Sequence, residues 1–170
     1  LISVIVLVFL DQLTKKWAVA TLKNQNPIEL IKGVLEFNYL ENHGAAFGIL
    51  QNKQLVFVIA GIIIMVFFLI ILYKMPFDKK YVHLNIFLSM IIGGAIGNMI
   101  DRIQNNYVID FIYFKIINFP VFNVADCYVT ISTIALAVLI LFYYKEEDLV
   151  VFGFKKSKQS VETETTNQEE

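Results

Sequence analysis

The chain has 170 residues, of which 57% are apolar and 17% are charged, and its formal net charge is −1. Globular domains average about 45–50% apolar and about 25% charged residues, so this composition, with a mean hydropathy of +0.63, excludes an ordinary soluble domain and predicts a membrane protein. The chain lacks the basic cluster that would indicate nucleic-acid binding. Its single cysteine, Cys127, excludes an intramolecular disulfide framework. Because the two histidines, His43 and His83, are far from each other in the sequence and only one cysteine is present, we expect no metal or other cofactor.

The first predicted element is a membrane span at about 1–22. It is uncharged to Leu10 and then carries Asp11 and Lys15. Residues four apart lie on one helix face and can form an ion pair, and pairing lowers the cost of charge in a bilayer. A cleaved signal peptide is the alternative for this segment, but no small-residue cleavage site follows the apolar stretch.

A loop with a short sheet is predicted next, over residues 23–54. Leu35, Phe37 and Tyr39 alternate with other residues in a partial two-residue period, which is typical of a strand with one buried face. Leu40 interrupts the alternation. We expect a small amphipathic sheet that rests on the membrane surface.

Three further spans are predicted at 55–73, 84–102 and 126–144, because a bilayer-crossing helix needs about 20 mainly apolar residues. Lysines gather in the connection between the second and third spans and after the fourth span. Such lysines favour the cytoplasmic side, which places both termini in the cytoplasm and residues 23–54 and 101–126 outside. The predicted fold class is an all-α membrane protein with four transmembrane helices and a small extracytoplasmic sheet.

The end of the third span combines small and polar residues. Gly93 and Gly97 are spaced to let another helix approach closely. Asn98 and Arg102 are four residues apart and share a helix face. Two interpretations stay open for them: a polar cluster that caps the helix end, or a set of donors for the carbonyl groups of a ligand.

Two carboxylates, Asp110 and Asp126, precede or open the fourth span. They are sixteen residues apart and cannot share a helix face, but a connection that folds back would bring them together. A close carboxylate pair holds one proton, so that one member can deprotonate water while the other protonates a carbonyl oxygen, as in aspartic proteases. A helix N-terminus would favour the anion of Asp126. The alternative is that Asp126 is a simple helix-start residue and Asp110 a turn residue.

An acidic tail is predicted after the fourth span. Residues 1–145 carry a formal charge of +3, whereas residues 146–170 carry −4 and have no large apolar residue after Phe154 other than Val161. Such a composition is typical of disorder. The predicted organisation is a membrane domain over 1–145, followed by a disordered cytoplasmic tail over 146–170.

Five blocks together resemble the bacterial lipoprotein signal peptidases, the signal peptidase II family of aspartyl peptidases. In chain order they are DQLTK at 11–15, NHGAAF at 42–47, GGAIGNMIDR at 93–102, VIDF at 108–111 and FNVAD at 122–126. The resemblance covers about residues 1–145 and leaves out the acidic tail. Each block alone is a weak signal, and their order is what makes the resemblance specific.

The resemblance implies a membrane aspartyl endopeptidase with Asp110 and Asp126 as its catalytic pair. It implies an extracytoplasmic β-cradle within residues 23–54, a monomer in the bacterial inner membrane, no cofactor, and inhibition by globomycin-like cyclic peptides. Substrates would be prolipoproteins with a diacylglyceryl cysteine, cut on the amino side of that cysteine. By the same comparison, substrate-binding or supporting roles are implied for Asn42, Gly44, Asn98, Arg102, Asn123, Asp11, Lys15 and Asp101.

Two other functions are compatible with the residues alone. One is a proton-coupled carrier that uses Asp110, Asp126 and Arg102 as a relay, and the other is a structural membrane subunit whose polar residues hold helices together. The carrier is disfavoured because its relay residues gather near one membrane surface.

Overall fold

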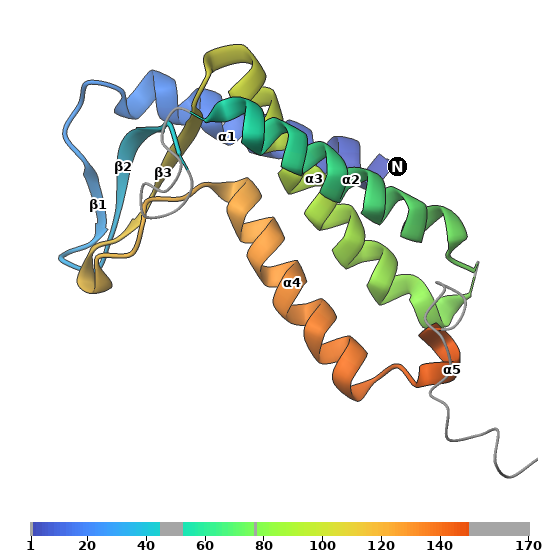
Figure 1. Cartoon of the computed structure of the whole chain (residues 1–170). Coiled ribbons are helices and arrows are strands. Elements are labelled where there is room, and N and C mark those ends of the chain that lie inside the picture. Colours follow the sequence, from blue (N-terminus) through green and yellow to red (C-terminus); the bar gives the residue numbers. More distant parts are fainter. Residues whose placement is uncertain (1, 45–52, 77, 150–170) are drawn as a thin grey trace, which may run out of the picture.

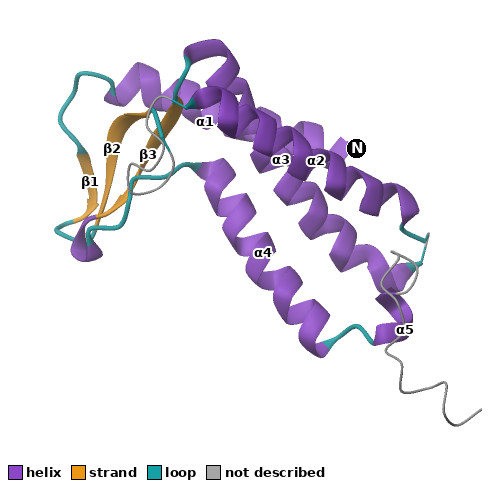
Figure 2. Cartoon of the chain, viewed as in Figure 1, coloured by secondary structure: helices purple, strands orange, loops and turns teal. Residues whose placement is uncertain are grey.

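The computed structural model describes residues 2–44, 53–76 and 78–149. Most of these residues are helical, and a small sheet lies at one end of the helices (Figures 1 and 2). The elements are α1 (Ile2–Leu22), β1 (Ile28–Ile31), β2 (Leu35–Asn42), α2 (Gln54–Lys74), the 3-10 turn η2 (Lys79–Tyr81), α3 (Val82–Asn105), β3 (Val108–Phe114), the 3-10 turn η3 (Lys115–Ile117), α4 (Val124–Phe142) and α5 (Glu146–Leu149).

Three helices of the described chain, α2, α3 and α4, are long and apolar enough to cross a membrane. They coincide with the second, third and fourth predicted spans. None of the residues of α2 is buried within the protein, which is the pattern of a helix whose side chains face lipid. The helix α1 is also 21 residues long, but it contains three charged residues, Asp11, Lys15 and Lys16, and is therefore not apolar enough to count as a membrane-crossing helix by composition. Four spans are therefore not confirmed, and the first span stays a prediction.

Glycines allow α3 to pack closely against two other helices. A Cβ atom on Gly93 would meet Leu7 of α1, one on Gly97 would meet Asp11 of α1, and one on Gly94 would lie 2.6 Å from the carbonyl oxygen of Ala125 in α4. Small residues at such interfaces let helix backbones approach one another. The predicted packing role of Gly93 and Gly97 is confirmed.

Gly94→Ala is expected to lower the free energy of unfolding by about 1–3 kcal/mol, the usual cost of overpacking. The obstacle is a backbone carbonyl, which cannot rotate away as a flexible side chain would. Gly61→Ala in α2 is the matched control, because a Cβ atom there meets no described atom within 4 Å. Unfolding in mixed detergent micelles measures both variants, and an equal effect on stability would contradict this packing argument.

The small sheet is antiparallel, with the strand order β1-β2-β3. The pairing of β2 with β3 shifts register between Phe37 and Leu40, at the point where the sequence alternation is interrupted. The predicted sheet is confirmed, but its predicted limits of 23–54 are too narrow. Its third strand, residues 108–114, comes from the connection before α4 and pairs with β2 along its length.

Aromatic packing fixes the sheet against the end of α1. Ala18 and Leu22 of α1 form a buried cluster with Ile109 and Phe111 of β3. The ring of Trp17 makes edge contacts with Phe111 and with Phe37 of β2. Because Phe111 directly follows Asp110, this cluster determines where the Asp110 backbone lies relative to the helices.

The start of the predicted tail requires a correction. Its first four residues form the helical turn α5 instead of a disordered segment. The Asp148 carboxylate accepts a hydrogen bond from the backbone N–H of Lys145 at 3.0 Å and pairs with Lys80 at 2.6 Å, and the Tyr81 hydroxyl donates to the Asp148 carbonyl at 3.1 Å. Composition does not reveal these partners. The rest of the predicted tail, residues 150–170, lies outside the described residues.

Candidate active site

Asp110 and Asp126 come from different elements and share one bridging residue, Asn123. The side-chain Nδ2 of Asn123 donates to Asp110 Oδ1 at 2.6 Å, and its backbone N–H donates to Asp126 Oδ2 at 3.1 Å. Both carboxyl groups line one cavity of about 580 Å³. The connection between α3 and α4 thus folds back and brings the two aspartates together, as predicted.

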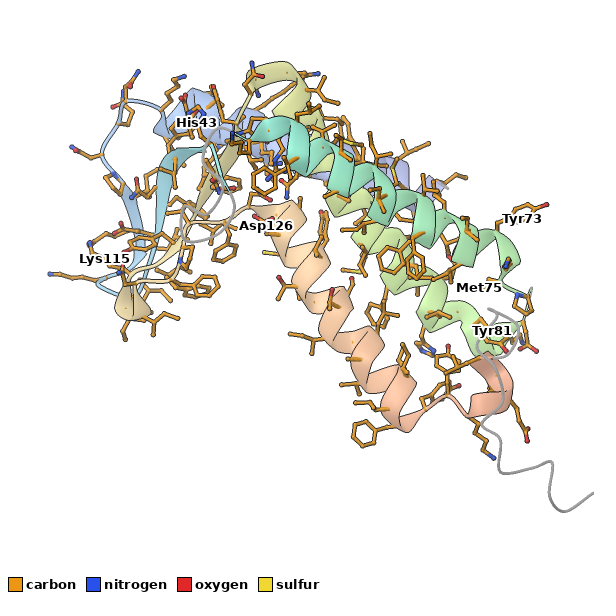
Figure 3. The ribbon with its side chains drawn as sticks, in the orientation of Figure 1. His43, Tyr73, Met75, Tyr81, Lys115 and Asp126 are labelled. Carbon is orange, nitrogen blue, oxygen red and sulfur yellow. The ribbon has the colours of Figure 1, made fainter. Side chains whose placement is uncertain are left out.

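The two aspartates hold different local positions. Asp110 lies in the interior of β3 with 1% of its surface exposed, so the alternative that it is a turn residue is wrong. Asp126 lies in the first turn of α4, where it forms a reciprocal capping box with Asn123. Figure 3 shows Asp126 at the beginning of α4, on the side of the molecule where His43 and the sheet lie, and far from Tyr73 and Met75 at the opposite helix ends.

A second amide hydrogen-bonds to each carboxyl group. Asn42 Nδ2 donates to Asp110 Oδ2 at 2.8 Å, and Asn98 Nδ2 donates to Asp126 Oδ1 at 2.8 Å. Asn42 is itself held by the backbone N–H of Gly44, which donates to its Oδ1 at 3.0 Å. All four carboxyl oxygens of the pair therefore receive a hydrogen bond, and the side chains have little freedom to rotate.

The cavity also contains an unused donor. Arg102 lines its wall, with the guanidinium carbon 4.9 Å from the ring centre of Phe57. One terminal nitrogen of Arg102 donates to the Asn98 carbonyl at 3.2 Å, whereas its buried Nε has no hydrogen-bond partner among the described residues. Buried donors in native proteins are normally satisfied, so this nitrogen favours the interpretation of Asn98 and Arg102 as donors for a ligand over a purely structural cap.

Burial and, to a smaller extent, the neighbouring charge of Asp126 raise the pKa of Asp110 to about 7, although the hydrogen bonds from Asn42 and Asn123 act in the opposite direction. Removal from water disfavours the charged form of a carboxyl group, and a nearby like charge does the same. At neutral pH the pair therefore holds a proton for part of the time, which is the state that acid–base chemistry requires.

Behind the aspartate pair lies a buried ionic cluster formed by Asp11, Lys15 and Asp101. The Lys15 ammonium lies 3.0 Å from Asp11 Oδ2 and 2.9 Å from Asp101 Oδ2, and each of the three residues is at most 1% exposed. The predicted pairing of Asp11 with Lys15 is confirmed. The second partner, Asp101, is not predictable from this spacing, because it lies on another helix.

The ionic cluster connects to the backbone around the site. Asp11 Oδ1 accepts a hydrogen bond from the backbone N–H of Ala125 at 3.1 Å, and Asp101 Oδ2 accepts one from Ile109 at 3.0 Å. Asp11 thus fixes the backbone just before Asp126, and Asp101 fixes the backbone just before Asp110. Lys15 also donates to Asn98 Oδ1 at 2.9 Å, which joins the cluster to the carboxyl pair.

Some residues of the site were not predicted. Phe57 and Phe122 line the cavity, and Gln12 donates to Asp101 Oδ1 at 3.0 Å. Gln12 lies within the DQLTK block and Phe122 opens the FNVAD block, so these blocks could have indicated both, whereas Phe57 is one of fifteen phenylalanines and has no distinguishing pattern. Three residues of the NHGAAF block, at 45–47, lie outside the described residues.

Comparisons with known proteins agree on one family. The family model described as signal peptidase II matches residues 3–142. The lipoprotein signal peptidase of Clostridium tetani is 42% identical over 159 residues, which cover 90% of this chain and 99% of that protein. The one from Caldanaerobacter subterraneus is 43% identical and covers 84% of this chain and 95% of its own.

Solved structures give the same result for the fold. A bacterial membrane enzyme superposes with a TM-score of 0.69 at 31% sequence identity, covering 92% of this chain and 93% of that chain. A second bacterial membrane enzyme structure also gives a TM-score of 0.69, at 32% identity, over 84% of this chain and 92% of the other.

Proposed function

This chain belongs to the signal peptidase II family and removes signal peptides from prolipoproteins, and we propose that it does so as an aspartic peptidase in which Asp110 and Asp126 are the catalytic pair. The observation that carries this proposal is the bridge through Asn123, which joins the two carboxyl groups in one cavity. The carrier and structural-subunit alternatives are not favoured, because the relatives are peptidases.

The proposed reaction is a general acid–base hydrolysis of the peptide bond. The ionised carboxyl group takes a proton from a water molecule, whose oxygen then attacks the scissile carbonyl carbon. The protonated carboxyl group donates its proton to the carbonyl oxygen, which gives a neutral tetrahedral intermediate. When this intermediate breaks down, the C–N bond is cleaved, the leaving amine takes the proton that the first carboxyl group took from water, and the other carboxyl group takes back a proton from one hydroxyl group of the intermediate. The pair is thereby returned to its singly protonated state.

The cavity suits a lipid-modified substrate. Its polar side, with Asn42 and Arg102, offers donors for the peptide carbonyls, while Phe57 of α2 and Ile131 of α4 supply apolar surface from membrane helices. We propose a prolipoprotein with a diacylglyceryl cysteine as the substrate, cut on the amino side of that cysteine. Such a substrate stays in the bilayer, and lateral diffusion brings it to the enzyme.

The protein is a multi-pass protein of the bacterial inner membrane. We propose that α1 is its fourth span, that both termini are cytoplasmic, and that the sheet is an extracytoplasmic β-cradle. The paired charges of Asp11 and Lys15 support a span for α1, because pairing within the protein lowers the cost of charge in lipid. The catalytic pair then lies near the outer surface, and the enzyme acts as a monomer.

Purified full-length protein in detergent tests this function directly with a peptide that carries a diacylglyceryl cysteine after a signal sequence. We expect one cleavage, on the amino side of the lipidated cysteine, and no cleavage of the same peptide without the lipid. A carrier or a structural subunit would cleave neither peptide.

Cleavage is expected to decline as the pH rises above about 7, because Asp110 then loses the proton that the pair shares. It is also expected to decline at acid pH, where the pair gains a second proton and no base remains to activate water. The dependence of kcat/KM on pH measures both limbs, which report the pair as a unit. A flat profile between about pH 5 and 9 would contradict a singly protonated pair.

A further inference from the structure

In several hydrogen bonds around the aspartate pair, one partner is a group that can only donate, so the donor and the acceptor are known. A backbone N–H and a lysine ammonium can only donate, since they have no lone pair to offer. Four such donors reach the asparagines and aspartates of the site: the Lys15 ammonium and the backbone N–H groups of Gly44, Asn123 and Asp126. Each donor fixes which end of its partner accepts.

The orientation of Asn98 follows from Lys15. The Lys15 ammonium lies 2.9 Å from Asn98 Oδ1, so this atom is the amide oxygen, and the amide NH₂ group is the one that faces Asp126 Oδ1 at 2.8 Å. The other carboxyl oxygen of Asp126 accepts from the backbone N–H of Asn123 at 3.1 Å. Both oxygens of Asp126 therefore accept from groups that donate toward them.

The orientations of the other two amides follow in the same way. The Asp126 backbone N–H donates to Asn123 Oδ1 at 3.0 Å, which turns the Asn123 NH₂ group toward Asp110 Oδ1. The Gly44 N–H donates to Asn42 Oδ1, which turns the Asn42 NH₂ group toward Asp110 Oδ2. Each aspartate therefore accepts two hydrogen bonds from N–H groups, so these bonds do not make one carboxyl group easier to ionise than the other. Any difference in their ionisation must come from their surroundings.

Three features of the surroundings distinguish Asp126 from Asp110. Asp126 is only half-buried, whereas Asp110 is 1% exposed. Asp126 lies in the first turn of α4, where the helix dipole and a backbone N–H favour an anion, whereas Asp110 lies in the strand β3 and accepts its hydrogen bonds from two side-chain amides. Arg102 also hydrogen-bonds to the carbonyl oxygen of Asn98, the residue whose side-chain amide donates to Asp126.

We propose that these surroundings make Asp126 the ionised member of the pair and Asp110 the member that carries the shared proton, with Asn98 as the positioning residue that links Lys15 to Asp126. The inference rests on the proposed function and assigns its roles: Asp126 takes the proton from water, and Asp110 donates its proton to the carbonyl oxygen. Lys15 acts through the orientation of Asn98, because its own charge is balanced by Asp11 and Asp101.

The remaining charged and titratable groups near the pair are consistent with this assignment. From α3 the pair is approached by Arg102 and by Asp101, which is bound to Lys15 of α1, and Cys127 of α4 lines the cavity beside Asp126. From the sheet and α2, the cavity-lining residues Asn42 and Phe57 are uncharged. The guanidinium of Arg102 also faces the pair, and among the described residues no carboxylate forms an ion pair with it.

Carbon NMR of the full-length protein with labelled aspartate carboxyl groups tests the assignment. The chain has six aspartates, and the signals lost in Asp110→Asn and Asp126→Asn identify the two that matter. At about pH 6, on the acid side of the raised pKa of Asp110, the Asp110 signal is expected at the position of a protonated carboxyl group and the Asp126 signal at that of a carboxylate. The reverse, or two carboxylate signals, would overturn the proposal.

Asn98→Leu tests the positioning role separately. Loss of its amide donor is expected to move the Asp126 signal toward the protonated position at the same pH, which a purely structural role would not do. An unchanged Asp126 signal in this variant would overturn that role, and if the variant does not fold, the wild-type spectrum still decides where the proton lies. Asp78→Asn, at the opposite helix ends, is the control and should leave both signals in place.

Cleavage assays and carboxyl spectra distinguish an error in the catalytic pair from an error in the position of the proton. If Asp110→Asn and Asp126→Asn retained cleavage, the proposed catalytic pair would be wrong whatever the spectra show. If both variants lost cleavage but the wild-type signals were reversed, the pair would stand and only the assignment of the proton would be wrong.

Discussion

Asp110→Asn and Asp126→Asn are each expected to lower the rate of prolipoprotein cleavage by at least about 10²–10⁴-fold, the usual contribution of general acid–base catalysis. An amide has nearly the shape of a carboxyl group, but it neither takes a proton from water nor donates one to a carbonyl oxygen. At position 126 the change also places an NH₂ group against one of two donors, the Asn98 amide or the Asn123 N–H. Cleavage of a diacylglyceryl-cysteine peptide in detergent measures the loss.

A matched control separates catalysis from a general effect of removing an aspartate. Asp78 caps the turn η2 by accepting a hydrogen bond from the Lys80 N–H, and it does not line the cavity of the aspartate pair. Asp78→Asn is expected to cleave at the wild-type rate. Wild-type activity in either Asp110→Asn or Asp126→Asn would show that the assignment of the catalytic pair is wrong.

Lys15→Met is expected to lower the free energy of unfolding by about 3–5 kcal/mol, because removing one partner of a buried ionic cluster leaves uncompensated charge. In this variant Asp11 and Asp101, each at most 1% exposed, would face each other without the ammonium that lies 3.0 Å or less from both. Methionine fills nearly the same volume, so the expected loss is electrostatic. Unfolding in mixed detergent micelles measures it.

Lys80→Met is the control for this second prediction. Lys80 also pairs with one aspartate, Asp148, at 2.6 Å, but its side chain is 40% exposed, and exposed ion pairs contribute little to stability. The free energy of unfolding is expected to change very little in Lys80→Met. Similar losses in the two lysine variants would mean that the burial of Lys15 does not determine its contribution.

The amino-acid sequence by itself determined the membrane character and indicated Asp110 and Asp126 as the candidate carboxylate pair. Hydropathy predicted the positions of α2, α3 and α4, because lipid-facing helices carry their apolar residues in long uncharged runs. The spacing of Gly93 and Gly97 predicted a close helix contact, and the four-residue interval between Asp11 and Lys15 predicted their pairing. These features are local, and contacts within one or two helical turns can be inferred from spacing alone.

The tertiary structure decided how these residues meet. The residue pattern around Asp110 did not reveal that this segment is a strand. A strand is stabilised by the strand it pairs with, and here that partner is β2, about seventy residues earlier in the chain. The same holds for Asp101, which joins Lys15 across two helices.

The bridge through Asn123 is the clearest example of what only folding determines. As a residue before a helix, Asn123 is predictable from the sequence as a cap, and the structure has this cap. Its second role, the hydrogen bond to Asp110, exists because β3 turns back toward the start of α4 through the pairing of Ile112 with Phe122. Sequence thus specified the chemical groups of the site, while long-range backbone pairing and buried ionic contacts placed them within hydrogen-bonding distance of one another.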